Sequence, residues 1–212
     1  MTAVRSAPSA RWLDALGAAK RALVLDAARA EFAEHGLEGA TMRRIATRAG
    51  VTTGAVYPLF ASKEAIYAEL LEQSLATLAE AVSAAAAAPP RGRLAHEAAA
   101  AAFLDHYLAH PFEVNLGLYA FHGLKRQGVG AALDDALNER LAATVRLLSP
   151  RDHGPRRRPG PPDAEAMLVF AQLIGLLVLE LAGRLRIGRA TPHGLLAAAR
   201  GRRRRTPTGD PP

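Results

Sequence analysis

Two histidines one helical turn apart could bind a metal ion. His106 and His110 have i, i+4 spacing, which can place two imidazoles on one ion. Asp105 and Glu97 are close in sequence, but no spacing fixes a third ligand. Two lone histidines near a helix end are usually solvated or cap the helix. The sequence therefore predicts no metal ligand and no cofactor.

No pattern of catalytic residues accompanies these histidines. The sequence has no Gly-rich phosphate loop, no nucleophile elbow, no HExxH and no convincing carboxylate pair. It has no cysteine, which excludes a disulfide framework, a thiolate metal site and a cysteine nucleophile. We expect no catalytic residues and conclude that the chain is not an enzyme.

A basic window near the N-terminus points to a polyanionic partner. The chain has a formal net charge of +7. Much of the excess arginine lies in two segments expected to be disordered. No Asp or Glu occurs between Glu38 and Glu64, and that window contains Arg43, Arg44, Arg48 and Lys63. This local window is stronger evidence for nucleic-acid binding than the total charge.

The elements that must position these side chains are helices. Alanine and leucine dominate, and no stretch alternates with period two. Glycine and proline mark the expected ends, such as Gly36, Gly50 and Pro89. We expect helices over about 19–35, 42–49, 52–60, 63–88, 94–110, 111–125, 131–149, 163–186 and 192–200.

The segment from Met42 to Phe60 has the pattern of a helix-turn-helix. Its first helix packs through Met42, Ile45 and Ala46, and Gly50 forms the turn. The second helix buries Val56 and Phe60 and leaves its other side free to enter a major groove. That free side carries small or hydrogen-bonding residues suited to base edges: Thr52, Thr53, Gly54, Ala55 and Tyr57.

Other residues of this region are expected to face phosphates. Thr41 and Lys63 lie at helix N-termini, where backbone amides and the helix dipole favour an anion. Arg43 and Arg44 extend that surface. Pro58 lacks an N–H for the bond to Gly54, so we expect the second helix to kink or end at Tyr57.

These residues resemble the signature of the TetR family. The resemblance rests on residues 39–46, 49–52 and 62–64, on Gly54, Tyr57 and Phe60, and on a similar first helix around Leu25–Ala28. It covers about Lys20 to Tyr67. It implies an all-α homodimer that binds a palindromic operator, usually as a repressor released by a small ligand. It also implies phosphate contacts by Tyr57 and Lys63, and base contacts by Thr52, Thr53 and Ala55.

The expected fold class is all-α. A three-helix helix-turn-helix DNA-binding head is joined to a larger helical domain for ligand binding and dimerisation. We expect a flexible N-terminal arm over 1–18, the DNA-binding domain over 19–67, the larger domain over 68–200 with a flexible loop at 150–162, and a disordered basic tail over 201–212.

The larger domain contains a concentration of aromatic and histidine residues. Phe103, Tyr107 and His110 share one helical face. A pocket lined by aromatics with a few polar groups suits a small organic effector. The alternative is an ordinary hydrophobic core. The expected ligand-binding residues are Phe103, Tyr107, Phe112, Tyr119, His122 and Phe170.

The helices over 163–200 are the expected homodimer interface. Residues 167–182 are apolar nearly all round, which is too much for a helix with one exposed side. The alternative is a buried central helix in a monomer. Gln172 and Glu180 interrupt this stretch, which is too short for a membrane span. The N-terminus lacks the apolar run of a signal peptide. We therefore expect a cytoplasmic protein.

The functional prediction is a ligand-responsive, sequence-specific transcriptional regulator bound to double-stranded operator DNA. A DNA-binding protein without small-molecule control, either an activator or an architectural protein, is the alternative. The sequence identifies neither the effector nor the operator, and it does not separate repressor from activator.

Overall fold

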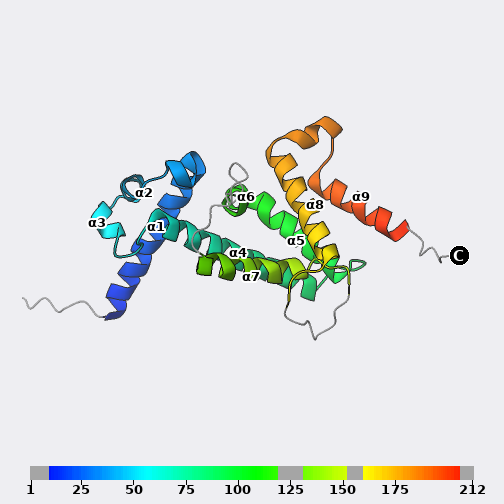
Figure 1. Cartoon of the computed structure of the whole chain (residues 1–212), viewed down its shortest axis with the longest axis horizontal. Helices are drawn as coiled ribbons and strands as arrows, with labels where there is room; N and C mark the ends of the chain where they lie inside the picture. Colours follow the sequence, from blue (N-terminus) through cyan, green and yellow to red (C-terminus); the bar gives the residue numbers. More distant parts are fainter. Residues whose placement is uncertain (1–9, 119–130, 152–159, 206–212) are drawn as a thin grey trace, which may run out of the picture. The chain divides into compact units, whose positions relative to one another are not determined.

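The structure, a computed structural model, describes residues 10–118, 131–151 and 160–205. Within these ranges the chain is helical and contains no β-strand, which confirms the predicted all-α class. The chain divides into two compact units, Met1–Leu71 and Glu72–Pro212 (Figure 1). The division falls inside a single helix, near the predicted boundary between residues 67 and 68.

The N-terminal unit contains α1 (Ala10–Gly39), α2 (Met42–Arg48), α3 (Thr53–Val56) and the first turns of α4 (Lys63–Ala87). Helix α1 begins at Ala10, so the predicted flexible arm is wrong for residues 10–18; residues 1–9 lie outside the described residues. Its first turns are rich in alanine, leucine and arginine, which are strong helix formers. Gly36 interrupts the helix with a φ of 66°, at the predicted end.

Most predicted core positions of this unit are buried, whereas Met42 is half-buried. Leu25, Ala28 and Phe32 of α1 are at most 7% exposed. Ile45, Ala46, Val56 and Phe60 from the helix-turn-helix are also buried. The ring of Phe32 meets that of Tyr67 edge-on at 5.7 Å, which ties α1 to α4. A compact core thus supports the two short helices α2 and α3.

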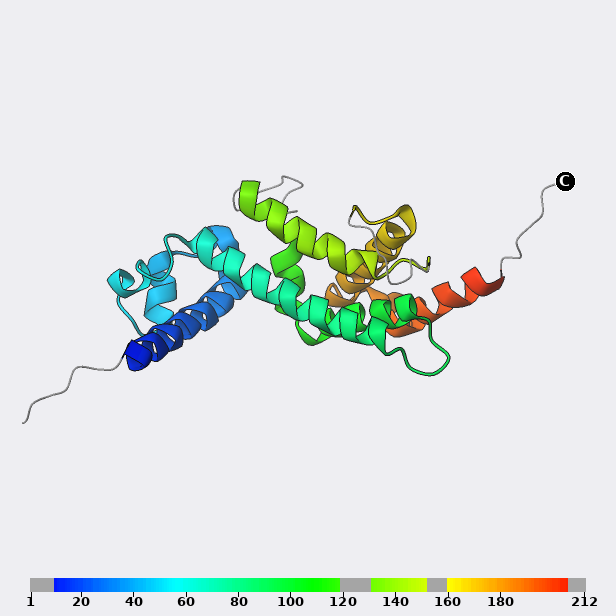
Figure 2. The same ribbon diagram turned by 90° about the horizontal axis from the view of Figure 1, so that it is seen from below.

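The C-terminal unit begins within α4, which Figure 2 shows as one continuous helix. It then contains α5 (Ala95–Ala109), α6 (Pro111–Leu118), α7 (Ala131–Arg146), α8 (Ala164–Leu181), the 3-10 helix η2 (Arg184–Gly188) and α9 (Pro192–Arg205). Helix α5 packs against α6, α8 and α9, and α7 packs against α8.

Several ends in this unit differ from the predicted ones. Helix α7 ends at Arg146, before Ser149. Helix α8 ends at Leu181 because Gly183 adopts a φ of 66°, and η2 follows. Helix α9 continues to Arg205, so the predicted disordered tail is wrong for residues 201–205, where arginine favours helix. Residues 119–130, 152–159 and 206–212 lie outside the described residues.

Helix α8 is apolar on more than one face. Ala166, Val169, Leu173 and Leu177 are buried, whereas several other large apolar side chains of this helix are exposed. By length and composition alone its 18 residues could cross a membrane, so the sequence argument that the stretch is too short does not hold. The core helix of a soluble protein can have the same length and composition, so this feature is weak evidence for a membrane span. In this structure 28% of the residues of the helix are buried.

Candidate nucleic-acid interface

The geometry of α2 and the turn after it sets the direction of α3. Thr41 caps α2 as predicted, because its hydroxyl accepts a 3.2 Å bond from the backbone N–H of Arg44. At the other end Gly50 has a φ of 68°. The amides of Gly50 and Val51 donate to the carbonyls of Thr47 and Ala46, at 3.1 and 3.0 Å. This is a Schellman motif, and it turns the chain into α3.

Helix α3 presents one side to solvent. Tyr57 is 55% exposed, and Thr52 and Gly54 are exposed as well. Thr53 and Ala55 are half-buried, and Val56 is fully buried. The hydroxyl of Thr52 makes no capping bond to the helix. Five residues of this segment were predicted to contact bases or phosphates. Three of them, Thr52, Gly54 and Tyr57, therefore lie on an open surface.

Pro58 ends α3 as predicted. The helix stops at Val56, with Tyr57 as its C-cap. The amides of Leu59 and Phe60 both donate to the carbonyl of Val56, at 2.9 and 3.0 Å. Regular helix therefore ends before Pro58, short of the predicted end near residue 60, and residues 57–59 form a turn.

Arg21 fixes the segment that follows α3, a role that sequence reasoning missed. Its Nη1 donates to the backbone carbonyl of Leu59 at 3.0 Å, and its Nε donates to Glu69 at 3.0 Å. Its guanidinium lies 4.3 Å from the centre of the Phe60 ring. Hydrogen bonding to Glu69 raises the pKa of Arg21 further. Arg21 and Glu69 are 48 residues apart in the sequence, so no local sequence pattern indicates that they are in contact.

Lys63 has a partner that the sequence did not indicate. Its Nζ donates to the backbone carbonyls of Leu37, Glu38 and Ala40 at 2.8, 3.2 and 3.1 Å. An ammonium group has three N–H donors, and all three are matched here. The side chain thus satisfies carbonyls at the end of α1. Its predicted phosphate contact stays a prediction.

Arg44 and Arg48 are held by acidic residues of α1. The side chain of Glu31 is only 2% exposed, and Arg44 Nε and Arg48 Nε lie 2.5 and 3.5 Å from its two oxygens. Arg48 also makes a two-pronged contact with Glu34, at 2.8 and 2.7 Å. Arg44 additionally contacts His35. Part of the predicted basic surface is therefore neutralised within the protein.

Arg43 is different from its neighbours. Its side chain is exposed, and no partner for its guanidinium is found among the described residues. Of the four basic residues in the acid-free window, it is the one most available to an external anion.

The predicted effector residues come together in part. The ring of Phe103 meets those of Tyr107 and Phe170 edge-on, at 5.0 and 5.8 Å, and this joins α5 to α8. Phe103 is fully buried, Tyr107 is 6% exposed, and Phe112 is half-buried. Burial, then the nearby charge of Glu113, raises the pKa of Tyr107, so its phenol remains a donor. Tyr119 and His122 lie outside the described residues.

A buried polar cluster lies beside these aromatics. Ser74 Oγ donates to Glu113 Oε2 at 2.7 Å, and His106 Nε2 lies 3.0 Å from the same oxygen. Burial alone would raise the pKa of Glu113, but the hydrogen bonds from Ser74 and His106 hold it below its ordinary value. Sequence reasoning considered Asp105 and Glu97 as acidic neighbours instead, because the contact between His106 and Glu113 depends on the turn between α5 and α6.

Comparison with known proteins decides the family. The family model for bacterial regulatory proteins of the tetR family matches residues 24–70. A transcriptional repressor of Corynebacterium diphtheriae, AcnR, is 32% identical over 139 residues, which cover 64% of this chain and 70% of that protein. The chain belongs to the TetR family. The match agrees with the residues, about 20–67, on which the resemblance rests.

Solved structures share this TetR-family fold along most of the chain. A Rhodococcus sp. RHA1 protein of unknown function has a TM-score of 0.64 and 25% identity, covering 85% of this chain and 91% of its own. A candidate transcriptional regulator of Streptomyces coelicolor has a TM-score of 0.53 and 28% identity, and the match covers 80% of this chain and 83% of that protein. This TetR-family protein is a DNA-binding transcriptional regulator, and its family is not one of enzymes.

Proposed function

We propose that this TetR-family protein is a ligand-responsive repressor that binds a palindromic operator as a homodimer in the cytoplasm. The observation that carries the proposal is the open face of α3, where Thr52, Gly54 and Tyr57 are exposed. A small, hydrogen-bonding face allows close approach to base edges in the major groove. The name of the Corynebacterium diphtheriae relative, a transcriptional repressor, supports repression over activation.

The DNA-contacting residues that we propose divide into two groups. Thr52, Thr53, Gly54 and Ala55 face bases, whereas Tyr57, Thr41 and Arg43 bind the phosphate backbone. Arg44 and Lys63 can reach a phosphate only by giving up part of their contacts with Glu31 or with the end of α1. We therefore rank Arg43 and Tyr57 above them as phosphate contacts.

The exposed stripe of α8 supports a homodimer. Leu168 is 62% exposed and Val178 is 44% exposed, and Ala171 and Gly175 lie between them at helical spacing and are also exposed. A Cβ built on Gly175 would meet nothing within 4 Å. Exposed apolar surface with small residues at its centre suits a second α8 at close range. A dimer would set two recognition helices about 34 Å apart, one turn of DNA.

The effector site that we propose lies among α5, α6 and α8. Phe103, Tyr107 and Phe170 form its aromatic part, and Phe112, Tyr119 and His122 complete the predicted set. Helix α4 begins in the N-terminal unit and ends in the C-terminal one, so it is the element through which an effector would act. A coupling of about 1–3 kcal/mol between the two sites is typical.

The first experiment is a selection of random double-stranded DNA by the purified protein at physiological salt. We expect a palindromic motif whose half-sites are about one helical turn apart. Enrichment without symmetry, or binding that depends only on salt, would instead favour an architectural protein without effector control. The selected site then serves to screen small organic molecules for release of the protein.

Two variants test the interface on that site. Tyr57→Ala removes a side chain that is 55% exposed, and Leu23→Ala removes one on α1 that is 53% exposed. We expect Tyr57→Ala to lower operator affinity about tenfold or more, equivalent to roughly 1.4 kcal/mol, with an unchanged melting temperature. Leu23→Ala should leave affinity unchanged. Equal affinities for the two variants would remove Tyr57 from the interface.

A further inference from the structure

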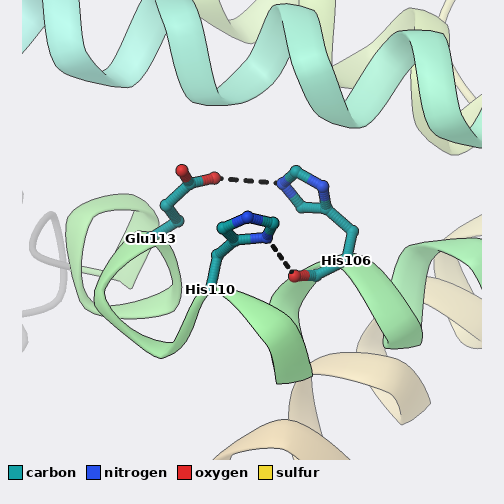
Figure 3. A group of neighbouring side chains, drawn as sticks. All are labelled: His106, His110 and Glu113. Atoms are coloured by element: carbon teal, nitrogen blue, oxygen red, sulfur yellow. Dashed lines mark hydrogen bonds and ion pairs between the residues drawn. The ribbon is translucent and has the colours of Figure 1, made fainter.

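Three side chains that can ligate a metal meet where α5 passes into α6. His106 lies near the end of α5, His110 is its C-cap, and Glu113 is in the first turn of α6. One ligand atom of each residue lies within 4.8 Å of the others. Figure 3 shows the Glu113 carboxylate in direct contact with the ring of His106, and the ring of His110 beside them. His110 has a non-helical φ of −126° and ψ of 66°, so the turn between α5 and α6, not the period of one helix, brings Glu113 back to His106.

The hydrogen bonds of His110 prepare it for a metal. Its Nδ1 lies 2.8 Å from the backbone carbonyl of His106, which can only accept, so Nδ1 carries the proton. Its Nε2 then keeps the lone pair that a metal binds. A ligating histidine usually donates its other N–H to a carbonyl or carboxylate in this way.

A second group orients the carboxylate. Ser74 Oγ donates to Glu113 Oε2 at 2.7 Å from α4, the helix that faces the cluster in Figure 3. The side chains of His106 and Glu113 are 4% and 10% exposed, whereas His110 is exposed. His106 and Glu113 therefore form the buried part of the cluster, and the side of His110 is open to solvent, so that an ion can enter there.

The distances between the three side chains are close to those of a metal site. Tetrahedral Zn²⁺ with bonds of about 2.0–2.1 Å holds its ligand atoms roughly 3.4 Å apart. His106 Nε2 and Glu113 Oε2 are already 3.0 Å apart. A ring nitrogen of His110 lies within 4.8 Å of ligand atoms of both residues, so coordination requires His110 to move closer to them. Coordination would replace the hydrogen bond between His106 and Glu113, and Ser74 would remain as a partner of the carboxylate.

We propose that His106, His110 and Glu113 form a binding site for a divalent first-row transition metal ion, of which Zn²⁺ fits best. Two imidazoles and one carboxylate are a donor set that such ions prefer, and three protein ligands leave a position open for water or a small ligand. The chain has no cysteine, so no thiolate competes for the ion. The ion would link α5 to α6 and, through Ser74 and Glu113, to α4.

The test measures metal binding by the full-length protein after removal of any affinity tag and chelation of bound metal. Isothermal titration with Zn²⁺ should give one strong site per chain. Co²⁺ should give the visible absorption of a four- or five-coordinate ion. No binding of Zn²⁺ at micromolar concentration by the folded protein would overturn the proposal. The measurement needs no DNA, so its failure would leave the proposed operator binding untouched.

Variants locate the site. His110→Ala removes an exposed ligand and should abolish strong Zn²⁺ binding and the Co²⁺ spectrum while the protein stays folded. Glu113→Gln should weaken binding about tenfold or more. His193→Ala is the matched control, because this exposed histidine pairs with Asp105 at 2.6 Å outside the cluster. Undiminished binding by His110→Ala, or loss of binding in His193→Ala, would overturn the assignment. If Glu113→Gln fails to fold, His110→Ala decides.

Discussion

Arg21 in the first helix donates a 3.0 Å hydrogen bond to the backbone carbonyl of Leu59, three residues after the recognition helix α3. The same guanidinium binds Glu69 of α4 and lies over the ring of Phe60. One side chain thus holds the segment that Pro58 forces out of the helix. We expect this contact to help orient Tyr57, although Arg21 is remote in sequence from α3.

Replacement of Arg21 by lysine should loosen this segment. Lysine keeps the charge but lacks the planar guanidinium fork, in which Nε and Nη2 pair with the two Glu69 oxygens while Nη1 binds the Leu59 carbonyl. We expect a loss of about 1–2 kcal/mol in unfolding free energy, a modest figure because the Arg21 side chain is 42% exposed. Thermal and urea unfolding measure this change, and operator affinity should fall as well. A variant with unchanged stability and reduced affinity would mean that Arg21 contacts DNA directly.

Replacement of Lys63 by methionine separates its two possible roles. Loss of the ammonium removes its three hydrogen bonds to the carbonyls of Leu37, Glu38 and Ala40, and we expect a cost of about 1–2 kcal/mol. For a chain of this size that lowers the melting temperature by roughly 2–8 °C. Lys20→Met, at an exposed position of α1, is the control. A phosphate contact would instead preserve stability and reduce the salt slope of DNA binding by about one.

Two glycines four residues apart should respond in opposite ways to alanine. Gly50 has a φ of 68°, so Gly50→Ala should destabilise the protein by about 1 kcal/mol. At Gly54 an added Cβ would meet only Thr52 Oγ1 at 4.0 Å, so Gly54→Ala should leave stability unchanged or slightly higher. Gly54→Ala should nevertheless weaken operator binding, since the methyl group stands on the open face of α3. Unimpaired binding would show that this face does not approach DNA closely.

The ion pair of Glu34 with Arg48 should appear in the acid stability of the protein. Hydrogen bonding to Arg48 holds the pKa of Glu34 below its ordinary value of 4.5. A carboxylate with a lowered pKa in the folded state stabilises the protein above its unfolded-state pKa, and this contribution disappears as the pH falls through the folded-state value. The melting temperature should therefore fall less between about pH 6 and pH 3 in Glu34→Gln than in the parent.

The α8 stripe predicts a dimer that a single charge disrupts. Leu168→Lys places an ammonium at a side chain that is 62% exposed, so the monomer should fold normally but no longer self-associate. Leu94→Lys, at a position 55% exposed outside α8, is the matched control and should remain dimeric. Sedimentation velocity measures the change, and operator affinity should fall with dimerisation. A dimer that persists in Leu168→Lys would exclude this face as the interface.

The helix-turn-helix could be predicted from the sequence because its determinants are local. Thr41 caps α2, Gly50 adopts a positive φ, and Pro58 ends α3, each for a reason that resides in the residue itself. The buried positions Ile45 and Val56 follow from helical periodicity. Helix ends without such markers were less accurate: α1 begins earlier and α9 ends later than expected.

The sequence by itself determined the helical class, the family and part of the open face of α3, since these depend on short-range pattern and on a motif within one segment. Only the tertiary structure decided which charged side chains are already occupied. Lys63 reaches the end of α1, Arg44 and Arg48 pair with α1, and Glu113 joins His106. Such contacts depend on how helices pack, and packing brings together residues whose separation in sequence carries no local signal.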